Sequence, residues 1–341
     1  MSIVGAFDVH RRQLTFEYLD TGSGELKRGR VIPADRQHLR EWLARFAGQD
    51  DVHFALEGCT GWRYVAEELV AAGITPHLAE PADTAALRGK KRHAKTDKTD
   101  TRHLRVHLLA GDLPECWIPP QHMLEARAVV RLYKDLLDER GAWHQRIAAT
   151  LFHQGVPLIG SMARPEGRAA VEQVNLSPAG RQAVQTGLRQ IDRLTGELDP
   201  LRRQLAMLSR RQPGCAALRA TQFGVGPVTA VAIWAELGDA RRFHNSDDVV
   251  RHTGLDITVR SSDGKGPPGS LSRQGPQLLR WALYESAKCA ARAAAPDHGY
   301  YTAVRDKRTA GLATLSVARK LARRCYHTLR ELGEEALAPA A

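Results

Sequence analysis

Alternating and continuous apolar segments near the start of the chain predict β-structure. Residues 3–9, IVGAFDV, form a short apolar run rich in β-branched residues, and the alternating segments QLTFEYLD and ELKRGRVIP follow it. Runs of this length and composition predict three strands joined as a meander. Asp35 follows as a suitable N-cap for a helix. The apolar positions of that helix are Leu39, Trp42, Leu43 and Phe46.

The next segments continue as alternating strands and helices. DVHFALEG predicts a buried strand that ends at Glu57, residues 64–72 predict a helix, and ITPHLAEP predicts a further strand. Three strands followed by alternating helices and strands are typical of an α/β domain. We place this domain at residues 1–115.

The middle of the chain has the periodicity of long helices. From about Gln121 the apolar positions recur at helical spacings over a charged background. Between Leu188 and Leu208 a second segment repeats Leu or Ile at spacings of three and four, which is typical of a coiled-coil seam. Pro200 lies within the seam, so we expect a kink or a new helix there. GVPLIGSMARPEG, between the two helices, predicts a loop.

Residues 116–210 are therefore expected to form a helical, coiled-coil region. Two interpretations of it remain open: an arm through which copies of the chain associate, or a helical hairpin packed within one chain. After Pro213 and Gly214, Gly-rich turns separate short helical segments. We place a third, mainly α-helical domain at residues 211–335.

Composition and charge narrow the class of protein. The 341 residues include 49 Lys and Arg against 38 Asp and Glu, a formal charge of +11, and 43% are hydrophobic. This is a globular composition, and a pI near 9.7 favours a polyanionic partner. We expect neither a secretion signal nor a membrane span, because no apolar stretch reaches the ~20 residues that a span needs. The five cysteines lack a C-x-x-C pair, so reduced thiols are expected.

Four acidic residues are candidates for a metal site. Asp8 lies near the end of the first strand and Glu57 at the end of a later one, so both carboxylates can emerge at one edge of a sheet. Asp97 and Asp100 begin a helix, and their spacing places them on one helical face. Together the four acids would form an oxygen cage suited to Mg²⁺ or Mn²⁺ and to phosphodiester chemistry. Taken singly, each acid also fits a capping or turn role.

Basic residues surround the last two of these acids. Between Arg88 and Arg105 the chain carries eight Lys or Arg residues and only two acids. Cations around a carboxylate pair favour a phosphodiester backbone as the ligand, and the alternative is a solvated charged loop. The residues expected to contact nucleic acid here are Lys90, Lys91, Arg92, Lys95, Lys98 and Arg102.

Two histidines follow on the same helix. His103 and His107 are four residues apart, as in a metal-binding pair. No third soft ligand is spaced to complete a zinc site, so we expect both to face solvent or DNA.

Two segments of the third domain have features of phosphate-binding elements. FGVGPVTAVAIWAEL resembles a helix-hairpin-helix element, in which Gly224 and Gly226 form the hairpin and backbone N–H groups hold a DNA phosphate. The alternative is a glycine turn that only joins two packed helices.

The second segment is a polar, Gly-rich loop that contains Ser261 and Ser262 and precedes the basic helix start SRQGPQLLR. A serine beside Lys265 and Arg273 is a candidate nucleophile toward a phosphate. An isolated loop serine is more often a turn residue, so local chemistry alone does not assign this role.

Six motifs together carry a resemblance that covers nearly the whole chain. They are FDVH, ALEGCTGW, AKTDKTDTRHLR, GVGPVTAVAIWAELGD, GLDITVRSSDGK and LSRQGPQLLRWALYE. With them the chain resembles the DEDD transposases of bacterial insertion-sequence family 110, which are bridge-RNA-guided recombinases. The resemblance implies a RuvC-like N-terminal domain with a ribonuclease-H-like fold and a serine-bearing C-terminal transposase domain.

The resemblance also implies which residues act. The motif acids fall on Asp8, Glu57, Asp97 and Asp100, and the nucleophile falls on Ser262. The loop reads SSDGK where many members read SSGG, so Ser261 stays open as the alternative.

The mechanism implied by the resemblance is strand transfer. The serine attacks a DNA phosphodiester to form a covalent phosphoserine link, metal held by the acids assists, and strands are rejoined without ATP. In agreement, the chain has no G-x-x-x-x-G-K-[ST] loop. The implied partners are double-stranded DNA at the element ends and target, an element-encoded guide RNA, and further copies of the chain in a dimer or tetramer. The implied location is the bacterial cytoplasm, at the nucleoid.

Three other functions fit parts of the sequence. One is a metal-dependent Holliday-junction-resolving endonuclease that uses water, in which Ser262 only contacts phosphate. Another is a noncatalytic nucleic-acid-binding protein whose four acids are structural. The third, an actin-like sugar kinase or ATPase, would need a second Gly-rich phosphate loop, which the later half of the chain lacks.

Overall fold

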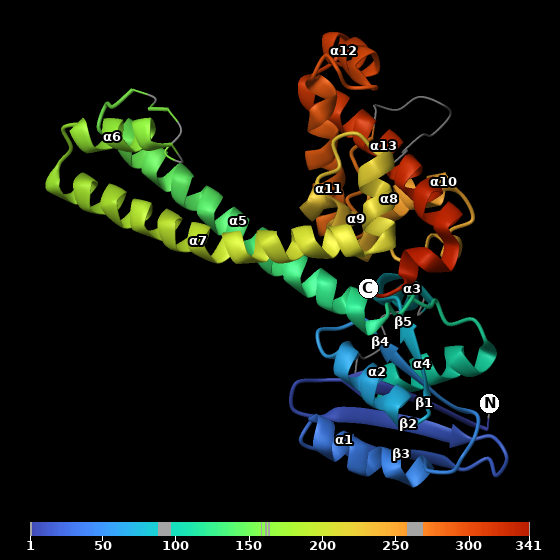
Figure 1. Cartoon of the computed structure of the whole chain (residues 1–341). Helices are drawn as coiled ribbons and strands as arrows, with labels where there is room; N and C mark the ends of the chain where they lie inside the picture. The colour runs from blue at the N-terminus through green and yellow to red at the C-terminus, as the bar shows by residue number, and fades with distance from the viewer. Residues whose placement is uncertain are drawn as a thin grey trace. The chain divides into compact units, whose positions relative to one another are not determined.

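The computed structural model describes residues 2–87, 97–157, 159–160, 162, 164–257 and 269–340, without the side chains of Asp97 and Lys98. Two compact units make up the chain, Met1–Ile118 and Pro119–Ala341 (Figure 1). Each unit is described by itself. The division of the second unit at residues 210 and 211 stays a prediction.

The first unit is built on a five-stranded sheet with the order β3-β2-β1-β4-β5. β1 pairs with β2 and β2 with β3 in antiparallel fashion, whereas β1 pairs with β4 and β4 with β5 in parallel. The predicted meander and both later strands are thus confirmed. The strands are β1 (Ile3–Val9), β2 (Leu14–Asp20), β3 (Leu26–Val31), β4 (Val52–Glu57) and β5 (Thr75–Ala79).

Of the helices of the first unit, α1 begins directly after the predicted cap Asp35, and α2 begins two residues before the predicted range 64–72. The Asp35 side chain caps α1 by accepting a hydrogen bond from the His38 backbone N–H at 2.9 Å. α1 ends before Phe46, which lies in a 3₁₀ turn, Ala44–Phe46. The helices are α1 (Arg36–Leu43), α2 (Trp62–Ala71), α3 (Pro81–Leu87) and α4 (Asp97–Ala110).

Both faces of the sheet are covered, and strand alternation sorts the side chains between them. Phe7 and Phe54 stack at 5.0 Å on the face covered by α1 and α2, where Phe7 also meets Trp42 edge-on. The opposite face is made of small residues, Val4, Ala6, Ala55 and Ala79, against which Leu104 and Leu108 of α4 pack. Small side chains allow α4 to lie close to the sheet. Because helices cover both faces of the sheet, the first unit has the predicted α/β architecture.

A buried ion pair anchors α4 on this second face. The Arg105 guanidinium donates to the Glu17 carboxylate of β2 (Nε to Oε1, 2.7 Å), and these residues are only 7% and 1% exposed. Arg28 on β3 donates to the other carboxylate oxygen at 2.5 Å. Two guanidinium groups on one carboxylate offset the cost of burying the charge, which would otherwise be several kcal/mol per ion.

The second unit begins with two long antiparallel helices. α5 (Gln121–His153) and α7 (Pro178–Arg211) lie side by side (Figure 1), which confirms both predicted helices. In the described chain they pack as a hairpin. The predicted seam is largely buried on α7, and α7 continues through Pro200, so the expectation of a new helix there was wrong. The predicted loop also runs too far, because α6 (Pro165–Gln173) begins within it.

The remaining helices of the second unit are short apart from the last, as predicted. α9 carries buried residues along its length, and it packs with α5, α7, α8 and α11. None of the helices in the described ranges is long and apolar enough to cross a membrane. All five cysteines are free thiols. The helices are α8 (Pro213–Thr221), α9 (Pro227–Leu237), α10 (Ser246–Thr253), α11 (Gln277–Ala287), α12 (His298–Lys307) and α13 (Ala310–Leu332).

We predict that Glu17→Gln lowers the free energy of unfolding of the first unit by about 3 kcal/mol, because it leaves the buried Arg105 charge without its counterion. Urea denaturation of the full chain, followed by tryptophan fluorescence, measures the change. Glu25→Gln is the matched control, since Glu25 pairs with Lys27 at the surface and its loss should cost under about 0.5 kcal/mol. Equal midpoints for the two variants would refute the anchoring role.

Candidate functional site

Asp8 and Glu57 lie on neighbouring parallel strands at the same edge of the sheet. Phe7 of β1 is in register with Leu56 of β4, so the next pair of residues is Asp8 and Glu57. Because side chains alternate along a strand, both acids share the face of Ala6 and Ala55, two residues before each. That face is the one covered by α4. Asp8 is 16% exposed, and its Oδ2 lies 3.0 Å from Nε2 of His10.

Asp100 faces the same side of the sheet from α4. It precedes Leu104 by four residues, and Leu104 packs against the small residues of this face. Residues four apart share one helical face, and Asp100 is accordingly only 8% exposed. Asp97 is the first residue of α4, and its side chain lies outside the described part. Three of the four predicted acids are thus distributed over one face of the sheet.

A buried oxygen without a partner adjoins these acids. Thr15 of β2 is the cross-strand partner of Asp8, it is 4% exposed, and its Oγ1 has no hydrogen-bond partner among the described residues. A buried hydroxyl normally has one. An orphan oxygen next to the Asp8 carboxylate suits a hard divalent cation with its water ligands, so these residues fit such a metal in type. Among the described side chains alone, no three His, Cys, Asp or Glu converge closely enough to hold an ion, and Asp97 is not among them.

The basic residues predicted to surround the acids do not all face outward. Arg102 is exposed on α4, whereas Arg105 turns inward to Glu17. The pattern of basic residues in the sequence gives no sign that Arg105 turns inward, or that Glu17 on β2 is its partner. The remaining predicted contacts, Lys90, Lys91, Arg92, Lys95 and the side chain of Lys98, lie outside the described residues.

His103 and His107 have partners inside the first unit. His103 Nε2 lies 3.1 Å from the Thr84 carbonyl oxygen, and His107 Nδ1 lies 2.8 Å from the Asp112 carboxylate. Both side chains are partly buried, so they do not face solvent freely, and the expected contact with DNA stays a prediction. Neither is joined to a described metal-binding cluster.

In the second unit, the turn between α8 and α9 requires glycine at Gly224. Its φ is +86°, and a Cβ there would lie 2.4 Å from the Ser286 carbonyl oxygen. Gly226 caps α9, and its backbone N–H donates to Thr229 Oγ1 at 2.9 Å. This N–H is therefore used within the chain, and phosphate binding by the turn would depend on other donors. An open hollow of about 520 Å³ lies over the turn, with Arg219 and Arg292 in its lining.

The loop that contains the candidate serines is closed at its base. Ser261, Ser262 and Lys265 lie outside the described residues. Before and after them, Ile257 and Leu271 form an antiparallel bridge. Arg273, with a φ of +54°, donates its backbone N–H to the Gly254 carbonyl at 3.1 Å.

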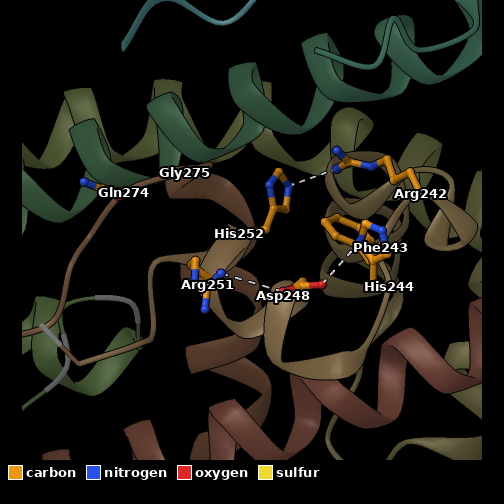
Figure 2. A pocket seen from close by; sticks show the side chains of 8 residues that line it. All are labelled: Arg242, Phe243, His244, Asp248, Arg251, His252, Gln274 and Gly275. Carbon is orange, nitrogen blue, oxygen red and sulfur yellow. Dashed lines mark hydrogen bonds and ion pairs between the residues drawn. The ribbon is translucent and has the colours of Figure 1, made fainter. Parts of the chain in front are cut away.

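A second open hollow, of about 390 Å³, lies beside this base (Figure 2). Inside it the Arg242 guanidinium donates to Nε2 of His252 at 3.2 Å. Burial, and secondarily the neighbouring Arg242 charge, lower the pKa of His252 to about 4. The imidazole is therefore neutral at pH 7. Arg242 and His252 are ten residues apart and belong to no motif, so sequence reasoning missed them.

Comparisons with known proteins assign the family. A model of DEDD transposases matches residues 5–153, and a model described as the transposase IS116/IS110/IS902 family matches residues 216–302. A probable family 20 transposase of Pseudomonas aeruginosa is 26% identical over 71% of this chain and 72% of its own. The transposase for insertion sequence element IS1111A of Coxiella burnetii is 23% identical over 77% of this chain and 72% of its own.

A mixed sheet with acids at the ends of neighbouring parallel strands, followed by a helical second unit, is consistent with a ribonuclease-H-like DEDD domain and a helical C-terminal part. The two family models match separate segments of the chain, and together these segments cover more than half of it. The chain belongs to the IS110 family of DEDD transposases. Membership in this family implies an enzyme that binds and cuts DNA and uses a divalent metal.

We predict that His252 makes the chain less stable in acid. The unfolded imidazole titrates near 6.5 and the folded one near 4, so between these values the unfolded state binds the additional proton. Above about pH 7 the protonation of His252 does not affect the free energy of unfolding. As the pH drops to 4, that free energy falls by about 3 kcal/mol.

Urea unfolding at pH 7 and pH 4.5 tests this, because His252→Gln should lose part of the acid sensitivity. His244→Gln is the control, since His244 is 95% exposed. An identical loss of stability in wild type and His252→Gln would contradict the prediction.

Proposed function

We propose that the protein is a transposase that cuts and rejoins DNA strands by serine transesterification, assisted by a divalent cation at Asp8, Glu57, Asp97 and Asp100. The observation that carries the proposal is the adjacent placement of Asp8 and Glu57 on the face over which α4 holds Asp100. Membership in a family of DEDD transposases supports the choice of these four acids.

The four acids would hold Mg²⁺ or Mn²⁺, since all four supply carboxylate oxygens. When bound, such a cation stabilises negative charge that develops on a phosphate undergoing displacement. The role of the protein is to place the carboxylates. β1 and β4 position two of them through the sheet register, and α4 positions Asp100 through its buried contacts with the sheet.

Ser262 is the proposed nucleophile, and its neighbour Ser261 is the alternative. The serine oxygen forms a bond to phosphorus while the bond from phosphorus to one deoxyribose oxygen breaks, and the proton passes to the departing oxygen. One phosphoester bond replaces another, so the reverse reaction on a new strand end rejoins DNA without ATP. Both serines lie outside the described residues. The support for a serine nucleophile is therefore the match of residues 216–302 to the transposase family.

Several further contacts belong to the proposal. Nucleic acid would be held by Lys90, Lys91, Arg92, Lys95, Lys98 and Arg102, by a helix-hairpin-helix element around Gly224 and Gly226, and by Lys265 and Arg273. The bound molecules would be double-stranded DNA at the element ends and target and an element-encoded guide RNA. Excess positive charge supports polyanion binding. Dimers or tetramers would form through the α5–α7 hairpin, and DNA as substrate would place the protein at the nucleoid.

We predict a covalent protein–DNA adduct. Full-length protein, Mg²⁺, a junction made from the element's own ends and the flanking transcript are combined, and denaturing gels with mass spectrometry locate the linkage. Ser262→Ala should abolish the adduct and Ser261→Ala should retain it. Metal-dependent cleavage without an adduct, with an active Ser262→Ala variant, would identify a hydrolytic junction resolvase instead.

We also predict that Asp8→Asn and Asp100→Asn each reduce strand cleavage by at least about 100-fold, because each removes one ligand charge from the cation. DNA affinity should remain within about twofold, since no cation of the protein is lost. Cleavage assays and fluorescence anisotropy measure the two effects. Asp112→Asn serves as the control, because Asp112 is exposed and pairs with His107 at the far end of α4. Full activity of both variants would mean that the acids are structural.

A further inference from the structure

The hollow beside the base of the serine loop is lined by three segments of the second unit. They are the segment before α10, α10 itself, and the chain that returns from the loop. Figure 2 shows Arg242 directed toward His252, and Arg251 and His244 on either side of Asp248. The lining residues are Arg242, Phe243, His244, Asp248, Arg251, His252, Gln274 and Gly275.

Arg242 is held in one orientation. It donates to the Leu237 carbonyl oxygen and to Nε2 of His252, each at 3.2 Å. Its guanidinium carbon lies 4.2 Å from the centre of the Phe243 ring, in a cation–π contact. Nε2 of His252 accepts this hydrogen bond because the imidazole is neutral. A guanidinium that is already ordered loses little conformational entropy when it binds an anion.

Arg251 supplies a second positive charge at the rim of the hollow. Its side chain is 73% exposed, and among the residues that the structure describes its nearest carboxylate oxygen, on Asp248, lies 3.7 Å away. This distance is too long for a hydrogen bond, so the guanidinium donors are not occupied by Asp248. His244 is also 3.8 Å from Asp248. Among the described residues that line the hollow, two arginines stand against one carboxylate, so this part of the lining is positively charged.

Close backbone packing holds the floor of the hollow in place. A Cβ at Gly275 would lie 2.0 Å from the His252 carbonyl oxygen, and one at Gly254 would lie 2.0 Å from the Gln274 carbonyl oxygen. Both glycines have positive φ, at +85° and +66°. Only glycine allows this approach, so the C-terminal end of α10 and the returning chain are locked together. Gln274 is thereby presented at the rim, where its amide is exposed.

We propose that this hollow binds a backbone phosphate of the DNA substrate, with Arg242 and Arg251 as the charged contacts and Gln274 as a hydrogen-bond donor. The inference rests on the proposed function, since it takes DNA as the substrate. An open, positively charged hollow suits one phosphate of a polymer that continues beyond it on both sides. Its position at the base of the serine loop favours the strand to be cut, which is why we assign DNA rather than RNA.

Salt-dependent DNA binding tests the proposal. Full-length protein is titrated onto a fluorescently labelled DNA duplex at increasing sodium chloride. Arg251→Gln should weaken binding several-fold and reduce the slope of log affinity against log salt by about one, the value for one lost phosphate contact. Arg305→Gln is the matched control, since it removes an exposed arginine of α12 that does not line the hollow. Asp248→Asn should strengthen binding, because it removes the one carboxylate among the described residues of the lining.

Each contrary outcome has a distinct meaning. Equal affinity and slope for Arg251→Gln and Arg305→Gln would overturn the site. A loss of affinity for an RNA duplex but not for DNA would overturn the assignment of the ligand. Adduct formation by the wild-type protein is measured separately at saturating DNA. A wild-type protein that forms no adduct, together with the reduced salt slope of Arg251→Gln, would refute serine chemistry while leaving the phosphate site intact.

Discussion

The buried ion pair between Glu17 and Arg105 is the contact on which the candidate metal site depends. A carboxylate that is 1% exposed needs a fixed counterion, and Arg105 reaches it only when α4 lies across β2 in one register. The same register seats Leu104 on the small residues of β1 and β4 and turns Asp100 toward the face that carries Asp8. The ion pair therefore fixes α4 on the sheet, and this places Asp100 over the face that carries Asp8.

Arginine has a comparable internal role in the second unit. Arg127 of α5 donates to the Ala235 carbonyl oxygen at the end of α9 (2.7 Å), and Arg319 of α13 donates to the Leu255 carbonyl oxygen (2.6 Å). Burial lowers the pKa of both guanidinium groups, which reflects the cost of removing them from water. Arg127 satisfies a carbonyl in the last turn of α9, Arg319 satisfies one just beyond α10, and both contacts hold segments together. The formal charge of +11 thus overstates the charge available to a nucleic acid.

Local patterns accounted for most elements of the fold. The strand around Phe7, the Asp35 cap and the α7 seam follow from alternation, capping chemistry and helical spacing, which act over a few residues. The failures also have physical reasons. Pro200 remains inside α7 because packing against neighbouring helices outweighs the lost hydrogen bond, and α6 was missed because Gly and Pro near its start resemble a loop.

The sequence by itself determined the order of the strands and of the two long helices, the family and the identity of the candidate acids, because these depend on residue type and spacing along the chain. Only the tertiary structure decided which side chains face each other. The pairing of Arg105 with Glu17 spans 88 residues, and the contact of Arg242 with His252 depends on how α10 folds back on the preceding segment. Neither has a periodic signal, because long-range contacts are set by the joint packing of elements rather than by local spacing.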